Sequence, residues 1–152
     1  MRPHFHEVAG LWERDGSLRG IYVQDTKAVH WNRFDQLLCQ YECPYTFNGV
    51  EALFPGSLRV LGNRKGSHLL TILLDGSIKI HCQFFIAGQL ELDISPKEIT
   101  CPLEHWEVLS FVETLADALE LSAAIAPENP EKTPFLTYVP QNSAWHIHDN
   151  PR

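Results

Sequence analysis

The chain has 152 residues and a mass of 17.3 kDa, with 44% hydrophobic and 20% charged residues. These values are typical of a globular domain and exclude a disordered chain. Nineteen acidic residues against twelve basic ones give a net charge of −7, which disfavours nucleic-acid binding and favours a basic protein partner through long-range attraction.

The apolar runs "HLLTILL" and "FFIAG" are much shorter than the roughly 20 residues of a membrane-spanning helix. Residues 1–20 contain charged and imidazole side chains where a secretory signal would carry an apolar core. We therefore expect a soluble, cytoplasmic protein with no membrane partner. In that compartment the four cysteines are expected to be thiols.

Two elements are predicted in the first third of the chain. Residues 17–24, "SLRGIYVQ", carry the β-branched and aromatic side chains of a strand. The apolar side chains that follow recur at spacings of three and four: Trp31, Phe34, Leu37, Leu38 and Tyr41. This spacing predicts an amphipathic helix over about 27–40.

Residues 45–66 have a less regular pattern. Asn48-Gly49 predicts a tight hairpin, because both residues tolerate the positive φ angles of a two-residue turn. A short strand is predicted from Leu58 to Leu61, between glycine-containing turns. The second of these turns, "LGNRKGSH", holds two glycines and basic side chains, but a strand follows it, so it fails the test for a nucleotide-binding loop.

Residues 69–94 carry the clearest pattern in the chain. Three apolar runs are separated by Asp75-Gly76 and Ala87-Gly88, which predicts a three-stranded antiparallel meander. The second and third strands alternate, and one face is apolar: Ile78, Ile80, Cys82, Phe84, Leu90, Leu92 and Ile94. The meander therefore has one core face and one face open to water.

A second amphipathic helix is predicted over about 102–124, beginning at Pro102. The proline-punctuated loop "APENPEKTP" and a strand over 135–139 follow. This order predicts an α+β fold: an antiparallel sheet of about five to six strands, with the 69–94 meander at its centre and the two helices packed on its apolar face. Residues 1–152 are expected to form one domain.

Two stretches near the chain ends, "PHFHE" and "WHIHD", each pair two histidines with a carboxylate. In an extended strand the two imidazoles of each pair share a face, so the stretches hold suitable zinc ligands. The candidate ligands are His4, His6, His146 and His148, with Glu7 and Asp149 beside them. Because chain ends are usually poorly ordered, we expect no metal site and no cofactor, and keep the metal site as the alternative.

Trp145 indicates that the C-terminal stretch is docked on the protein, because an indole seldom stays exposed to water. A nucleophilic pair is conceivable at Cys101 and His105, one helical turn apart, but a cysteine at a helix start is more often structural. No Gly-x-Ser-x-Gly motif is present.

The polar face of the meander is the predicted partner-binding surface. Its residues are Lys79, His81, Gln83, Phe85, Gln89, Glu91 and Asp93. A charged sheet face is usually only solvated, but a rigid face with an aromatic side chain among charges also has the composition of an interface.

These features predict a non-enzymatic, acidic protein-binding domain that masks a basic partner. A bacterial immunity or antitoxin-type protein has this size, this charge and no catalytic motif, and the comparison is one of composition only. The alternative is a small enzyme or metal-dependent binding protein that uses the terminal histidine pairs and nearby carboxylates. The sequence leaves homo-oligomerisation open.

Overall fold

A computed structural model of the chain describes residues 1–75, 77–129 and 133–148. Its strands are β1 (Arg19–Gln24), β2 (Tyr45–Phe47), β3 (Val50–Glu51), β4 (His68–Leu73), β5 (Lys79–Cys82), β6 (Gln89–Ile94), β7 (Ala123–Pro127), β8 (Leu136–Val139) and β9 (Ala144–Ile147). Its helices are α1 (Ala28–Leu38), α2 (Ser57–Gly62) and α3 (Pro102–Leu119), with short 3₁₀ helices at Pro96–Glu98 and Pro140–Asn142. None of the helices in these ranges is long and apolar enough to cross a membrane.

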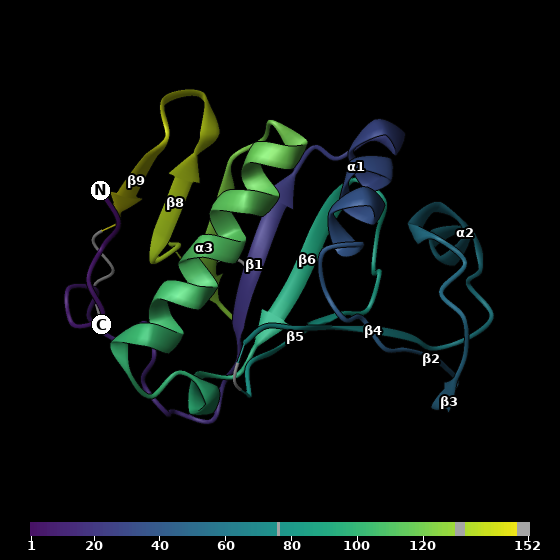
Figure 1. The fold of residues 1–152 in the computed structure, drawn as a ribbon, viewed down its shortest axis with the longest axis horizontal. Helices are drawn as coiled ribbons and strands as arrows, with labels where there is room; N and C mark the ends of the chain where they lie inside the picture. Colours follow the sequence, from purple (N-terminus) through teal and green to yellow (C-terminus); the bar gives the residue numbers. More distant parts are fainter. Residues whose placement is uncertain (76, 130–132, 149–152) are drawn as a thin grey trace.

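The predicted α+β class is confirmed, but the sheet is larger than predicted. Within the described residues, nine strands form one antiparallel sheet in the order β3-β2-β4-β5-β6-β1-β7-β8-β9 (Figure 1). The prediction of about five to six strands was too low, and β7 and β9 in particular gave no recognisable strand pattern. The β1 strand lies between β6 and β7, so the N-terminal strand runs through the middle of the sheet.

One face of the sheet is covered by α1 and α3, which lie side by side in front of it in Figure 1. The predicted apolar face of the meander is confirmed, since all seven of its side chains are buried. They share one hydrophobic cluster with the buried stripes of both helices, among them Trp31, Phe34, Phe111 and Leu115. No helix of the described residues covers the opposite face of the sheet, and the candidate site lies on that face.

The second long helix is shorter than predicted. It ends at Leu119, and Glu120 takes a left-handed conformation with φ 57°. The chain then turns back as β7, which pairs with β1 and β8. Placing the helix end at residue 124 was wrong because Ala123–Pro127 is rich in alanine, which favours helix when no partner strand is in view.

The segment from Ser57 to Gly62 is a helix, so the predicted strand from Leu58 to Leu61 was wrong. The reason lies in another element: the Asp35 carboxylate of α1 accepts hydrogen bonds from the Ser57 amide and hydroxyl. A carboxylate there satisfies a free first-turn amide as an N-cap does. The predicted Asn48-Gly49 hairpin is present, with φ angles of 52° and 79°.

The predicted Asp75-Gly76 turn and the "APENPEKTP" loop fall partly outside the described residues, at Gly76 and at residues 130–132. The Asp149 carboxylate of the second histidine stretch lies outside them as well.

The N-terminal segment and β9 meet at one side chain of α3. Arg2 donates two hydrogen bonds to the Glu113 carboxylate, at 2.7 and 3.0 Å. The indole Nε1 of Trp145 on β9 donates to the same carboxylate at 2.7 Å. The prediction that Trp145 docks the C-terminal stretch is therefore confirmed.

Candidate functional site

The seven predicted partner-binding residues lie on or beside the open face of the sheet. On β5 and β6, His81 stands opposite Asp93, and Glu91 and Gln89 follow on the same side. Gln83 and Phe85 come after the end of β5. Four of the seven, Gln83, Phe85, Glu91 and Asp93, line one hollow, whereas Lys79, His81 and Gln89 lie outside its wall.

This hollow exists because β5 leaves the sheet early. Phe84 takes a left-handed conformation with φ 57°, and the pairing with β6 stops at Cys82 opposite Leu92. A non-glycine residue in that region interrupts a strand. Glu91 is thereby left without a β5 neighbour, and Gln83 and Phe85 form the rim of a space of about 290 Å³. We call it the acidic hollow; Tyr22, Gln83, Phe85, Glu91, Asp93 and Glu128 are in its wall.

Tyr22 enters the acidic hollow because Gly20 has no side chain. A Cβ at Gly20 would lie 2.3 Å from the Tyr22 ring, so the ring lies over the glycine on the open face of β1. Tyr22 and Gly20 were not among the predicted site residues. The signal was present in "RGIYVQ", where Gly20 and Tyr22 alternate with the core residues Ile21 and Val23.

The electrostatics of the acidic hollow are dominated by its carboxylates. Burial raises the pKa of Tyr22 to about 12, and the charges of Glu91, Asp93 and Glu128 and a hydrogen bond to Glu91 act in the same direction. Burial also raises the pKa of Asp93, opposed by His81 and reinforced by Glu91 and Glu128. The negative charge of each group therefore raises the cost of ionising its neighbours.

The carboxylates of the acidic hollow are not paired with a cation in the part of the chain that the structure describes. Among the described residues, no lysine or arginine forms an ion pair with Glu91, Asp93 or Glu128. Arg19 also lines the hollow. Its guanidinium is buried, donates to the carbonyls of Gly10, Leu11 and Glu13 and pairs with Asp15, so its charge is used elsewhere. His81 faces Asp93 across the strands and is itself bonded through Nδ1 to the Thr71 hydroxyl at 3.2 Å.

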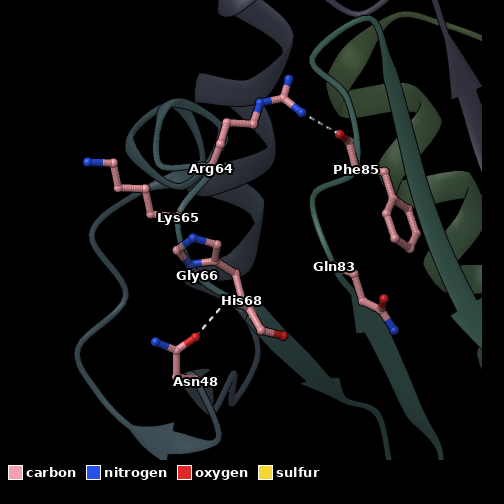
Figure 2. Close-up of a pocket in the computed structure, with 8 residues that line it drawn as sticks. Asn48, Arg64, Lys65, Gly66, His68, Gln83 and Phe85 are labelled. Carbon is pink, nitrogen blue, oxygen red and sulfur yellow. Dashed lines mark hydrogen bonds between the residues drawn. The ribbon is translucent and has the colours of Figure 1, made fainter.

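A second hollow of about 440 Å³ adjoins the first and shares Gln83 and Phe85 with it. We call it the basic hollow; the remaining residues of its wall are Asn48, Arg64, Lys65, Gly66, Ser67 and His68. Figure 2 shows Arg64 reaching toward the backbone of Phe85, where it donates to the carbonyl at 3.4 Å. Lys65 extends away from Phe85 in the same view.

The terminal histidines take no part in either hollow. The His146 and His148 rings contact each other with centroids 4.4 Å apart, and His148 Nε2 hydrogen-bonds with the Thr137 hydroxyl at 2.8 Å. His4 and His6 are exposed in the N-terminal segment. Within the described part of the chain, no three His, Cys, Asp or Glu side chains are grouped as metal ligands would be.

Cys101 and His105 do not act as a pair. Cys101 is the N-cap residue of α3, whereas His105 is fully buried. Its Nδ1 accepts a hydrogen bond from the Trp12 indole and its Nε2 donates to the Pro3 carbonyl. Both ring nitrogens are therefore used to hold the N-terminal segment.

Comparison with protein-family models, with curated proteins and with solved structures finds no match to this chain. What the protein does must therefore be inferred from its own side chains.

Proposed function

We propose that the protein acts by binding a basic protein partner on the open face of its sheet, with a lysine or arginine side chain of the partner in the acidic hollow. The observation that carries the proposal is the group of Glu91, Asp93 and Glu128 around a space of about 290 Å³, without a paired cation among the described residues. Such a group favours a cation supplied from outside.

The aromatic side chains suit the same ligand. Phe85 is 50% exposed at the rim, and the Tyr22 ring lies against the sheet in the wall. A guanidinium or ammonium gains free energy over an aromatic face, and aromatic side chains are enriched where interfaces concentrate their binding energy. The hollow is also built on β1 and β6 in the middle of the sheet, so the carboxylates of Glu91 and Asp93 are held by paired strands.

The net charge of −7 also supports the proposal, because an acidic surface attracts a basic partner over long distances before contact. By analogy with proteins of this size and charge, we propose that the chain is a bacterial immunity or antitoxin-type protein that masks a basic toxin. This analogy is one of composition only, so the binding of a basic side chain is what needs to be tested.

The test is a chemical-shift titration of the isotopically labelled protein with N-acetyl-arginine amide. We expect saturable shifts confined to the amides around Tyr22, Gln83, Phe85 and Glu91, weakened by added salt. The Glu91→Lys, Asp93→Lys variant should lose them. The matched control is Glu42→Lys, Glu51→Lys, which changes the net charge equally at exposed positions outside both hollows. Equal loss in both variants, or shifts spread over the surface, would contradict the proposal.

A further inference from the structure

The wall of the basic hollow contains cations and hydrogen-bond donors but no carboxylate. Arg64 and Lys65 are both exposed, and within the described residues neither forms an ion pair. A guanidinium has five N–H donors, and among the described residues the guanidinium of Arg64 donates only to the Phe85 carbonyl. In a chain with a net charge of −7, this is a local excess of positive charge without an internal acceptor.

The neighbouring polar groups point to donation as well. The Asn48 side-chain oxygen accepts from the Ser67 amide, so its NH₂ group is what it can offer a ligand. His68 is already bonded through Nδ1 to the Tyr45 hydroxyl at 2.6 Å and through Nε2 to the Asn63 carbonyl at 2.9 Å. An anion would therefore meet donors from Arg64, Lys65 and the side-chain amides.

A carboxylate suits this hollow better than a phosphate. Phosphate sites draw on several free backbone amides. Here the Ser67 amide is bonded to Asn48, the Lys65 amide to Asn63 and the Asn48 amide to the Ser67 carbonyl. What remains is the single amide of Gly66, the Lys65 ammonium and the planar guanidinium of Arg64, whose paired N–H groups match the two oxygens of a carboxylate.

The two hollows adjoin, because Gln83 and Phe85 stand in both walls. Resting on the proposed function, we infer that the partner segment is dipolar: its basic side chain enters the acidic hollow, and a carboxylate beside it, from an aspartate, a glutamate or a chain end, binds at Arg64 in the basic hollow. The part of the partner segment between these two charged groups passes over Phe85, which is half exposed between the acidic and the basic hollow. The surface would thereby select partners by the arrangement of their positive and negative side chains as well as by their net charge.

The experiment is a selection of random phage-displayed peptides on the immobilised 152-residue chain. On the wild type, we expect enriched peptides to carry an arginine or lysine and an acidic residue a few positions apart. On the Arg64→Glu, Lys65→Glu variant, the basic residue should persist and the acidic one should lose its enrichment. The matched control Arg14→Glu, Lys97→Glu makes the same charge change at exposed positions outside both hollows and should select like the wild type.

Binding constants then measure the coupling. Replacing the acidic residue of a selected peptide with its amide should weaken binding to the wild type about fivefold, and binding to Arg64→Glu, Lys65→Glu less than about twofold. Inorganic phosphate and acetate, each titrated alone at equal ionic strength, serve as the two anion probes. Saturable phosphate binding tighter than acetate, lost in the same variant, would overturn the carboxylate assignment.

The outcomes separate this inference from the proposed function. Peptides enriched in basic residues alone, with no effect of the Arg64→Glu, Lys65→Glu change, would overturn the inference and leave the proposed function standing. No enrichment of basic residues on the wild type would overturn both. Loss of the acidic residue in the Arg14→Glu, Lys97→Glu control would assign the effect to net charge and would also overturn the inference.

Discussion

The indole Nε1 of Trp12 donates a hydrogen bond to Nδ1 of His105 over 2.9 Å. Since Nδ1 is the acceptor, the proton of the neutral ring is on Nε2, which donates to the Pro3 carbonyl at 2.8 Å. The fully buried ring thus joins α3 to two points of the N-terminal segment. A second proton on His105 would set two donors, the indole and Nδ1–H, against each other.

This geometry predicts a loss of stability at mildly acidic pH. Burial lowers the pKa of His105 below its ordinary 6.5, the bond to Pro3 opposes the shift, and the nearby His4 adds to it. As the pH falls below 6.5, the unfolded chain takes up this proton first. The free energy of unfolding should therefore decrease from about 6.5 downwards, until folded His105 titrates as well. Urea unfolding at a series of pH values between about 5 and 8 measures it.

The variant His105→Gln removes the titrating ring while its amide can still accept from Trp12 and donate to Pro3. We expect it to flatten the slope of stability against pH that is due to His105. His105→Phe, which loses both hydrogen bonds, should be less stable at every pH and equally flat. An unchanged slope in both variants would assign the acid sensitivity to other groups, such as His148, whose pKa burial and His146 also lower.

The core of the meander gives a prediction on stability. Ile80 and Leu92 are fully buried beneath the helices. Truncating either to alanine should lower the free energy of unfolding by about 2–5 kcal/mol, because it removes apolar burial and leaves a cavity. Leu103→Ala, at a leucine that is 68% exposed, is the control and should stay within about 0.5 kcal/mol. Small effects at both buried sites, below about 1 kcal/mol, would mean that the sheet faces are reversed.

The contact between Gly20 and Tyr22 predicts a coupled pair. Gly20→Ala places a methyl group where the Tyr22 ring lies, and should destabilise the protein by about 1–3 kcal/mol as an overpacking change. In a Tyr22→Ala background the same change should cost less, with a coupling of at least about 0.5 kcal/mol in a double-mutant cycle. Purely additive effects would show that the ring does not need the glycine.

The features of the fold and of the candidate site that the sequence predicts are those fixed by contacts between residues close in the chain. The alternation in the second and third strands of the meander predicts which face is buried, and it brings Gln83, Phe85, Glu91 and Asp93 together on the other face. Tyr22 obeys the same alternation, but joining it to Glu91 requires the pairing of β1 with β6, which lie almost seventy positions apart in the chain.

The missed elements are those held by distant partners. The α2 helix starts at the Asp35 carboxylate of α1, and β9 is fastened by the bond from Trp145 to Glu113. The β7 strand has an alanine-rich sequence and owes its conformation to β1 and β8. Since β7 was not predicted, Glu128 directly after it could not be placed in the acidic hollow.

The prediction that the terminal histidines bind no metal can be tested by elemental analysis. We expect substoichiometric zinc, iron and manganese after gentle purification, and no change in Tm on adding a chelator, because a metal site needs about four converging ligands. A stoichiometric metal that is lost in the His6→Ala, His146→Ala double variant would contradict this. It would also make the metal-dependent alternative the better account of the protein.

The composition of the open face predicts which residues control the association rate of the partner and which control its dissociation rate. Acidic groups attract a basic partner over about 8 Å at physiological ionic strength, so Glu91→Lys, Asp93→Lys should mainly lower the association rate and its dependence on salt. Phe85→Ala removes a half-exposed aromatic contact that forms only on docking, so it should mainly raise the dissociation rate.

Association rates at low and high salt, measured once the partner is in hand, test this division against Glu42→Lys, Glu51→Lys as the control of equal net charge. If the control slows association as much as Glu91→Lys, Asp93→Lys does, the attraction belongs to the whole surface. If neither salt nor the reversal affects association, electrostatic steering plays no part. Binding unaffected by Phe85→Ala but abolished by changes on the exposed side of α1 or α3 would place the partner on the opposite, helix-covered face.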